Sequence, residues 1–195
     1  MDQNISVHPG SGGASGLNGS SVLKTSLTKI TIIIPTDAYF LSGIRDFTLS
    51  LTRNMTGFSD QEAYRFQSVV DELCNNAIEH GSAKGQEIKI VFSSVGGEYI
   101  NIEVEDTGTG LVKKTAAEMT QLVAERRNPG YLQHLGIRGR GLAQIVASWT
   151  DELEFKDRTE GGLIVRAKKY LHVPENQQNV LQKNPALNVV KQPTS

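Results

Sequence analysis

The chain has 195 residues, of which 38% are hydrophobic and 21% charged, and its formal net charge is −1. A chain of this length can bury a stable core without disulfides or structural metal ions. The near-neutral charge argues against a strong overall attraction to nucleic acid or to an anionic membrane. The single cysteine, Cys74, excludes an intramolecular disulfide and fits a reducing compartment. No signal segment is evident at the start, and no apolar run approaches the roughly 20 residues that cross a bilayer. We therefore expect a cytoplasmic protein.

Composition indicates one folded domain between two polar tails. Residues 1–26 are rich in Gly and Ser and almost free of large apolar side chains, which predicts a flexible tail. Residues 173–195 are rich in Asn and Gln, which predicts a second, disordered tail. The folded domain is expected to span residues 27–172.

The first part of this domain has the pattern of a strand followed by two helices. Thr28 to Ile34 is a β-branched run that predicts a strand, which Pro35 should stop. Residues 38–55 place apolar side chains at helical spacing, at Leu41, Ile44, Phe47 and Leu51. Ser59 and Glu62 then have the spacing of a capping box, which predicts the start of a second helix.

A hairpin is predicted next. Gln86–Phe92 and Tyr99–Glu105 both alternate apolar and polar residues, and Gly96-Gly97 lies in the short connection between them. The following segment, residues 111–135, has a less regular pattern and is expected to be rich in loops.

The end of the domain has the pattern of a helix and a closing hairpin. Helical spacing returns at Leu142, Ile145, Val146 and Trp149. Glu152–Asp157 and Leu163–Tyr170 then alternate around Gly161-Gly162, which predicts two further strands. This order of elements predicts an α+β fold, a two-layer α/β sandwich with helices covering one face of a mostly antiparallel sheet.

The predicted second helix carries the most informative polar pair in the chain. Glu72 and Asn76 lie four residues apart and therefore on one helical face. The amide oxygen can ligate Mg²⁺, and the carboxylate can take a proton from an attacking hydroxyl. Cys74 is expected to be buried rather than catalytic. The other side of the helix is apolar, at Phe66, Val69, Val70, Leu73 and Ala77. An amphipathic surface helix with ordinary polar residues is the alternative.

The first of two glycine motifs follows a predicted strand. Asp106 opens the run D-T-G-T-G, and a carboxylate at a strand end can accept a hydrogen bond from an adenine amino group. Gly108 and Gly110 would let the backbone approach a ligand closely. Taken alone, the motif also fits an ordinary turn.

The second glycine motif, Gly136 to Leu142, reads G-I-R-G-R-G-L and directly precedes a predicted helix. Gly139 and Gly141 would leave backbone N–H groups free for phosphate oxygens at the helix start. Arg138 and Arg140 could add charge-assisted contacts to the same oxygens. The alternative is a flexible helix start with solvated arginines.

Taken in order, these motifs resemble the GHKL (Bergerat-fold) ATPase superfamily. Glu72–Ala77 resembles its N box, Asp106–Gly110 its first glycine box and Gly139–Leu142 its second. The resemblance covers about residues 29–170. It is closest to the anti-sigma factor serine/threonine-protein kinases of bacterial partner-switching systems. In many of these kinases a His-Gly pair closes the N box, as His80-Gly81 does here. It implies a histidine-kinase-like ATP-binding fold that uses ATP and Mg²⁺.

The resemblance also implies roles for individual residues. Glu72 would be the general base, Asn76 the Mg²⁺ ligand and Asp106 the adenine acceptor. The implied nucleotide-binding set is Asn76, Asp106, Gly108, Gly110, Arg138, Gly139, Arg140, Gly141 and Leu142. Residues 111–135 would form the ATP lid, where Lys113, Lys114, Arg126 and Arg127 could approach phosphate.

One position departs from the family pattern. A threonine often opens the last strand of these proteins and helps to hold adenine, whereas here Leu163 follows Gly162. A missing neutral hydrogen bond typically costs about 0.5–1.5 kcal/mol, so we expect weaker ATP binding rather than none.

The implied activity is ATP-dependent phosphorylation of a serine or threonine on a STAS-type anti-sigma-factor antagonist, combined with sequestration of a sigma factor. Neither nucleic acid nor a membrane is an expected direct partner, and homodimerisation is implied by the resemblance alone. The alternative is a non-catalytic, nucleotide-gated protein-binding module of the same fold. A detached histidine-kinase-like catalytic domain is a more distant alternative.

Overall fold

The computed structural model of the chain describes residues 27–55, 58–95, 98–111, 113–126, 141–146, 149–171 and 190–191. The elements are, in order, β1 (Leu27–Pro35), η1 (Ala38–Phe40), α1 (Leu41–Arg53), α2 (Asp60–Asn76), η2 (Ala77–Gly81), β2 (Glu87–Val95), β3 (Tyr99–Glu105), α3 (Ala116–Arg126), η3 (Leu142–Val146), β4 (Glu152–Asp157), β5 (Leu163–Tyr170) and β6 (Val190–Lys191). Here η1 is a 3₁₀ turn, and η2 and η3 are π-helical turns.

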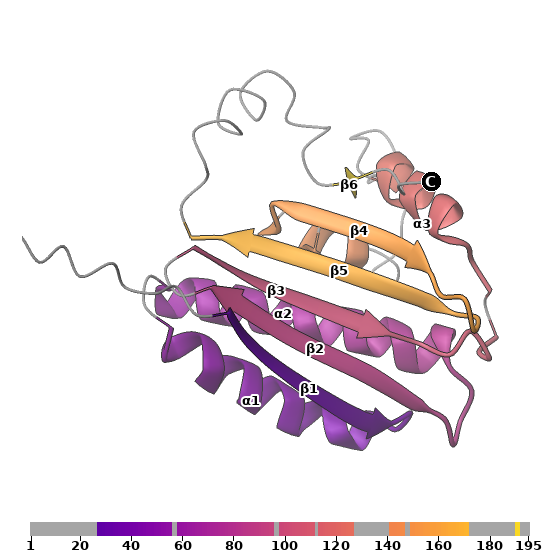
Figure 1. The fold of residues 1–195 in the computed structure, drawn as a ribbon, viewed down its shortest axis with the longest axis horizontal. Coiled ribbons are helices and arrows are strands. Elements are labelled where there is room, and N and C mark those ends of the chain that lie inside the picture. The colour runs from indigo at the N-terminus through magenta and orange to yellow at the C-terminus, as the bar shows by residue number, and fades with distance from the viewer. Residues whose placement is uncertain are drawn as a thin grey trace, which may run out of the picture.

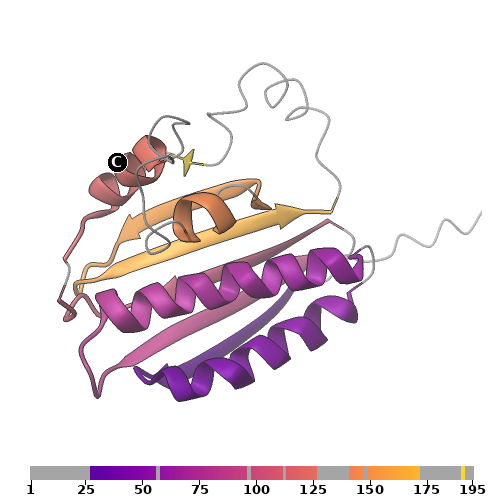
Figure 2. The same ribbon diagram turned by 180° about the vertical axis from the view of Figure 1, so that it is seen from behind.

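The strands form one sheet in the order β1-β2-β3-β5-β4-β6. All neighbouring pairs from β1 to β4 are antiparallel, and the short β6 pairs with β4 in parallel. Figures 1 and 2, which show the molecule from opposite sides, place α1, α2 and η3 over one face of this sheet. The predicted α+β sandwich with helices on one face is therefore confirmed.

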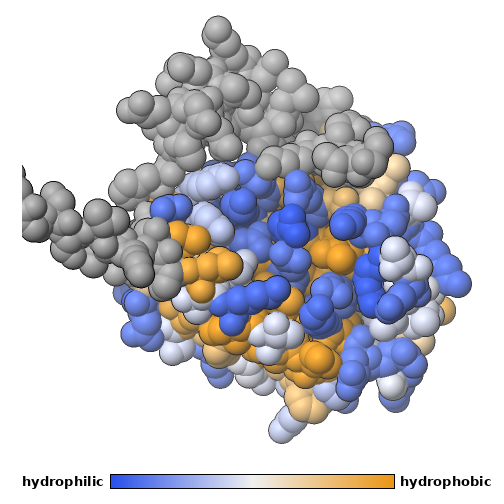
Figure 3. Space-filling model, viewed as in Figure 1, coloured by the Kyte–Doolittle hydropathy of each residue, from blue (hydrophilic) through white to orange (hydrophobic). Residues whose placement is uncertain are grey.

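Strand register decides which side chains meet these helices. Successive side chains of a strand point to opposite faces of a sheet, so alternation in the sequence becomes two different surfaces. Ile90 pairs with Val104 and Phe92 with Ile102, and all four are buried in the core beneath the helices. The opposite face carries charged residues of β3, β4 and β5, and hydrophilic residues cover much of it in Figure 3.

The start of α2 is held by the predicted capping box. The Ser59 side-chain oxygen accepts from the Glu62 backbone N–H at 3.2 Å, and the Glu62 carboxylate accepts from the Ser59 backbone N–H at 2.8 Å. These bonds satisfy two groups that a helix start otherwise leaves unpaired. The bonds that the Glu62 carboxylate accepts from the Ser59 backbone N–H and hydroxyl also lower its pKa, because they stabilise its ionised form.

The apolar face of α2 forms the centre of the core. Phe66, Val69, Val70 and Leu73 are buried against the sheet and the neighbouring helices. The Phe66 ring lies 5.7 Å from the Trp149 ring, centroid to centroid. Cys74 is buried too, as expected from its place on the helix. Desolvation raises the pKa of its thiol to about 12.

Most sequence-predicted elements are confirmed, and one boundary differs slightly, at Pro35. This residue was expected to stop the first strand, but it is the last residue of β1 and faces Glu87. An edge strand tolerates a missing N–H donor, because its outer side has no ladder to maintain.

The prediction of an irregular segment over residues 111–135 is wrong for α3. Thr115 and Glu118 form a second capping box: the Thr115 hydroxyl accepts from the Glu118 N–H at 3.2 Å, and the Glu118 carboxylate accepts from the Thr115 N–H at 2.7 Å. The sequence T-A-A-E signals this helix start, and the missed helix buries Ala116 and Val123 in the core.

Some predictions lie outside the described residues. These are the N-terminal tail over residues 1–26, the Gly96-Gly97 connection and most of the C-terminal tail, of which only Val190–Lys191 is described, as β6. Residues 127–135 of the expected lid, with Arg127, also lie outside the described part. Ile145 belongs to η3, but its side chain is outside the described part. No helix in the described part of the chain is long and apolar enough to cross a membrane.

The core assignment predicts the effect of truncating Phe66. Its side chain is fully buried, so Phe66→Ala leaves a cavity and should lower the free energy of unfolding by about 3–5 kcal/mol. Gln61→Ala, on the exposed part of the same helix, is the control and should change it by less than about 0.5 kcal/mol. Urea denaturation followed by circular dichroism measures both, and equal effects would contradict this description of the core.

Candidate functional site

One large cavity, of about 610 Å³, opens at the end of the sheet where β3 and β4 finish. Its walls come from α2 and η2, from the loop after β3, from the start of α3 and from the β4–β5 turn. The volume is typical of sites that hold small organic ligands. Five of the sequence-predicted site residues line it, namely Glu72, Asn76, Asp106, Gly108 and Leu142.

Glu72 and Asn76 meet on the face of α2 that borders the cavity. The Asn76 side-chain amide nitrogen donates to Glu72 Oε1 at 2.9 Å, and both side chains are half-buried. This bond orients the carboxylate and leaves the Asn76 amide oxygen available as an acceptor or metal ligand. The arrangement can therefore supply a base and a hard oxygen ligand one helical turn apart.

Asp106 is a buried carboxylate at the end of β3. Its Oδ1 atom accepts from the backbone N–H of Gly108 at 2.9 Å and of Leu163 at 3.1 Å. In the described part of the chain both bonds fall on Oδ1, which leaves Oδ2 to accept from a ligand. Burial raises the pKa of Asp106, while these two bonds and the nearby charge of Arg158 oppose the increase. The structure thus presents a fixed hydrogen-bond acceptor in an apolar setting.

Gly81 and Gly162 lie against Asp106 at distances that no larger residue permits, and Gly108 lies as closely against Gly162. A Cβ at Gly81 would lie 2.5 Å from the Asp106 carboxyl carbon, and one at Gly162 would overlap the Asp106 backbone oxygen. Gly108 and Gly162 also have φ of +65° and +91°, a region that favours glycine. Gly81 and Gly162 were absent from the predicted site residues. The H-G pair after the N box and the G-G pair in the hairpin were the signals that could have found them.

The remaining glycines of the two motifs take positions that spacing does not predict. A Cβ at Gly141 would overlap the Glu72 carboxylate, so this glycine lies directly against the candidate base. A Cβ at Gly110 would overlap the His80 backbone oxygen, and Gly110 does not line the cavity. The other predicted residues of the second motif, Arg138, Gly139 and Arg140, lie outside the described residues.

Basic side chains line the cavity from two parts of the chain. Lys113, Lys114 and Arg126 line it from the segment that contains α3, and Arg158 lines it from the β4–β5 turn. Asp157 Oδ1 accepts from the Ala116 backbone N–H at 2.8 Å, so the start of α3 is fastened to the end of β4. Sequence analysis missed Asp157 and Arg158, because single charged residues in a hairpin carry no motif.

A family model described as a histidine kinase-like ATPase domain matches residues 34–169 of the chain. The match extends from the end of β1 to the end of β5 and includes every residue that lines the cavity. A comparison with curated proteins found no match.

The packing around Asp106 predicts opposite effects for two glycine substitutions. Gly162→Ala introduces a Cβ at positive φ against the Asp106 backbone, and should lower the free energy of unfolding by about 2 kcal/mol or more. Gly43→Ala in α1 meets nothing within 4 Å, and should raise it by about 0.5–1 kcal/mol. Thermal denaturation of both variants tests this, and a neutral Gly162→Ala would contradict the described contact.

Proposed function

The chain belongs to the histidine kinase-like ATPase family, and on this basis we propose that it is an ATP-dependent serine/threonine-protein kinase that acts as an anti-sigma factor. It transfers the γ-phosphoryl group of Mg-ATP to a serine or threonine of a STAS-type anti-sigma-factor antagonist, and it sequesters a sigma factor. The observation that carries the proposal is the convergence of Glu72, Asn76 and Asp106 on a single cavity.

The nucleobase end of the proposed site centres on Asp106. Its ionised carboxylate accepts a hydrogen bond from the 6-amino group of adenine, which a 6-oxo purine lacks. Leu163 and Val165 line the same cavity as Asp106 and supply apolar surface for the plane of the base. The Leu163 backbone also holds Asp106, so the residue that lacks the family's hydroxyl still contributes to the acceptor.

The phosphate end of the proposed site centres on Asn76. Asn76 lines the cavity, and its amide nitrogen donates to Glu72 while its amide oxygen is a hard ligand. This oxygen fits Mg²⁺, which commonly binds through few protein oxygens together with phosphate oxygens and water. When bound, Mg²⁺ would neutralise charge on the phosphates, and Lys113, Lys114 and Arg126 lie on the cavity wall to add to this effect.

Glu72 acts as the general base in the proposed reaction. As the substrate hydroxyl oxygen bonds to the γ-phosphorus, the bond from that phosphorus to the bridging oxygen of ADP breaks and the hydroxyl proton passes to Glu72. The hydrogen bond from Asn76 keeps the carboxylate oriented for this transfer. The protein substrate must bring its hydroxyl within hydrogen-bond reach of Glu72, about 2.6–3.2 Å.

Nucleotide binding is the first test of the proposed function. Isothermal titration of the purified protein with ATP and with ADP should show binding that Mg²⁺ strengthens. Asp106→Ala should weaken it by about tenfold or more, because it removes the acceptor for adenine. Asn76→Ala should retain weak binding but lose the strengthening by Mg²⁺.

Two outcomes of this titration would contradict the proposal. If the wild-type protein binds no nucleotide at high concentration, a protein-binding module of the same fold that does not use ATP becomes the better reading. If Asn76→Ala keeps the full effect of Mg²⁺, its assignment as the metal ligand is wrong.

Phosphotransfer tests the role of Glu72. With γ-labelled ATP and a STAS-type antagonist protein, Glu72→Gln should lower transfer by roughly 10²–10⁴-fold and leave ATP affinity nearly unchanged. Glu79→Gln, an exposed carboxylate on the neighbouring η2, is the matched control and should transfer phosphate normally. Retained transfer by Glu72→Gln would remove Glu72 from the mechanism.

A further inference from the structure

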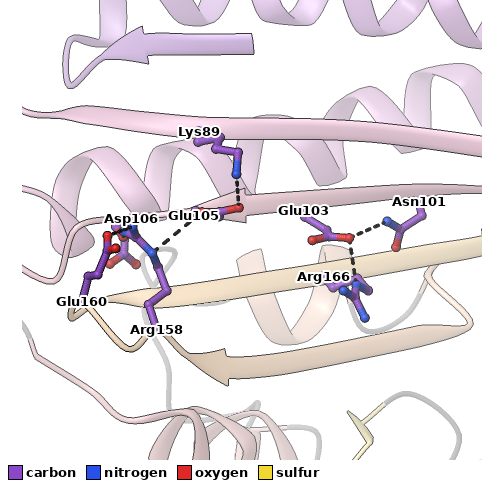
Figure 4. A network of polar contacts seen from close by, with 8 residues as sticks. All are labelled: Lys89, Asn101, Glu103, Glu105, Asp106, Arg158, Glu160 and Arg166. Atoms are coloured by element: carbon purple, nitrogen blue, oxygen red, sulfur yellow. Dashed lines mark hydrogen bonds and ion pairs between the residues drawn. The ribbon is translucent and has the colours of Figure 1, made fainter. Parts of the chain in front are cut away.

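Arg158 connects the candidate nucleotide site to the charged face of the sheet. It follows β4 directly, and its guanidinium Nη1 donates to the backbone oxygen of Asp106. Its Nε lies 3.7 Å from Glu105 Oε2 and its Nη2 lies 3.4 Å from Glu160 Oε2. Figure 4 shows the side chain reaching from the turn to these partners. One guanidinium thus contacts the backbone of the candidate adenine acceptor and two carboxylates.

The shape of the β4–β5 turn sets the position of Arg158. Its backbone N–H donates to the Gly162 oxygen at 3.0 Å, and its own backbone oxygen accepts from the Gly161 N–H at 3.1 Å. Both glycines have positive φ, of +92° and +91°. The turn therefore closes tightly and directs Arg158 back toward the end of β3.

Glu105, the residue before Asp106, is held from two directions. Lys89 on β2 donates to its Oε1 atom at 2.8 Å, and Arg158 lies beside its Oε2 atom. The side chain of Glu105 is only 15% exposed, so these contacts are partly shielded from water. Together they fasten the end of β3 to both β2 and the β4–β5 turn.

We propose that Arg158 is a positioning residue for base recognition, which holds Asp106 as an acceptor and so makes the site select a purine with a 6-amino group over one with a 6-oxo group. The inference rests on the nucleotide site of the proposed function. Arg158 acts through the Asp106 backbone and through Glu105, and it supplies a restraint at the place where Leu163 lacks a hydroxyl.

Two physical effects make this selection depend on Arg158. The first is geometric, because the guanidinium fixes the backbone from which the Asp106 carboxylate extends. The second is electrostatic, because a positive charge favours the ionised carboxylate, which can only accept hydrogen bonds. A protonated Asp106 could donate to a 6-oxo group, and burial already raises its pKa. Without Arg158 that pKa should rise further.

Other charged or titratable groups also line this cavity, and each could affect the pH dependence of binding. They are Glu72 from α2, His80 from η2, Lys113, Lys114 and Arg126 from the segment around α3, and Asp157 from β4. The nearby positive charge of Arg158 opposes the increase that burial causes in the pKa of Asp106. The ratio of the affinities for two nucleotides with identical phosphates cancels effects that act on the phosphates alone.

The test compares the affinities for ATP and for ITP, which carries a 6-oxo base, in the wild type and in three variants. Arg158→Ala should weaken ATP binding by about tenfold and leave ITP binding almost unchanged, so that the ATP-to-ITP ratio falls. Arg158→Lys retains the charge but not the planar fork, and should give an intermediate ratio. Arg166→Ala is the matched control, since Arg166 joins Glu103 and Glu154 on the same sheet face in two ion pairs. It should leave the ratio unchanged.

The pH dependence of the ratio separates positioning from a general loss of stability. In the wild type the ratio should fall as the pH drops through the raised pKa of Asp106, and in Arg158→Ala this fall should begin at a higher pH. If Arg158→Ala does not fold, the affinities for ATP and ITP are compared between the wild type and Arg158→Lys instead.

Two outcomes overturn the inference in distinguishable ways. If the wild type binds ATP and the Arg158 variants keep its ATP-to-ITP ratio and its pH profile, Arg158 has no role in base recognition while the proposed function stands. If the wild type binds no ATP at all, the proposed function fails and the inference fails with it.

Discussion

The candidate site depends on the two hydrogen bonds that join Asp106 to Leu163. The Asp106 N–H donates to the Leu163 oxygen at 3.0 Å, and the Leu163 N–H donates to Asp106 Oδ1 at 3.1 Å. These bonds bring together the end of β3 and the start of β5, which are neighbouring strands of the sheet. Gly81, Gly108 and Gly162 pack tightly around this junction, because a Cβ atom at any of these positions would overlap a neighbouring atom.

A buried carboxylate is unfavourable unless its charge is compensated. At Asp106 the compensation comes from two fixed backbone N–H groups and from Arg158. The same groups also determine what the carboxylate can recognise, because they occupy one oxygen and favour the ionised form. Stability and recognition at this position therefore have the same physical origin, and the surrounding glycines allow both.

Local patterns were sufficient to predict most of the fold. The alternation of Ile88, Ile90 and Phe92 indicated a strand, and the Ser59–Glu62 capping box indicated the start of α2; both depend on contacts between residues near in the sequence. The missed helix α3 carried a similar signal in Thr115 and Glu118. That signal lies within a segment whose apolar spacing is irregular, so the hydrophobic pattern did not indicate a helix there.

By itself the sequence determined the types and order of most elements, α3 excepted, and it placed Glu72 and Asn76 on one helical face, because helical geometry relates residues four apart. Only the tertiary structure decided that Gly141 lies against Glu72 and that Arg158 reaches the Asp106 backbone, 52 residues away. Contacts over such separations depend on the order of strands in the sheet and on the conformation of its turns. These result from the packing of the whole domain, and no local pattern specifies them.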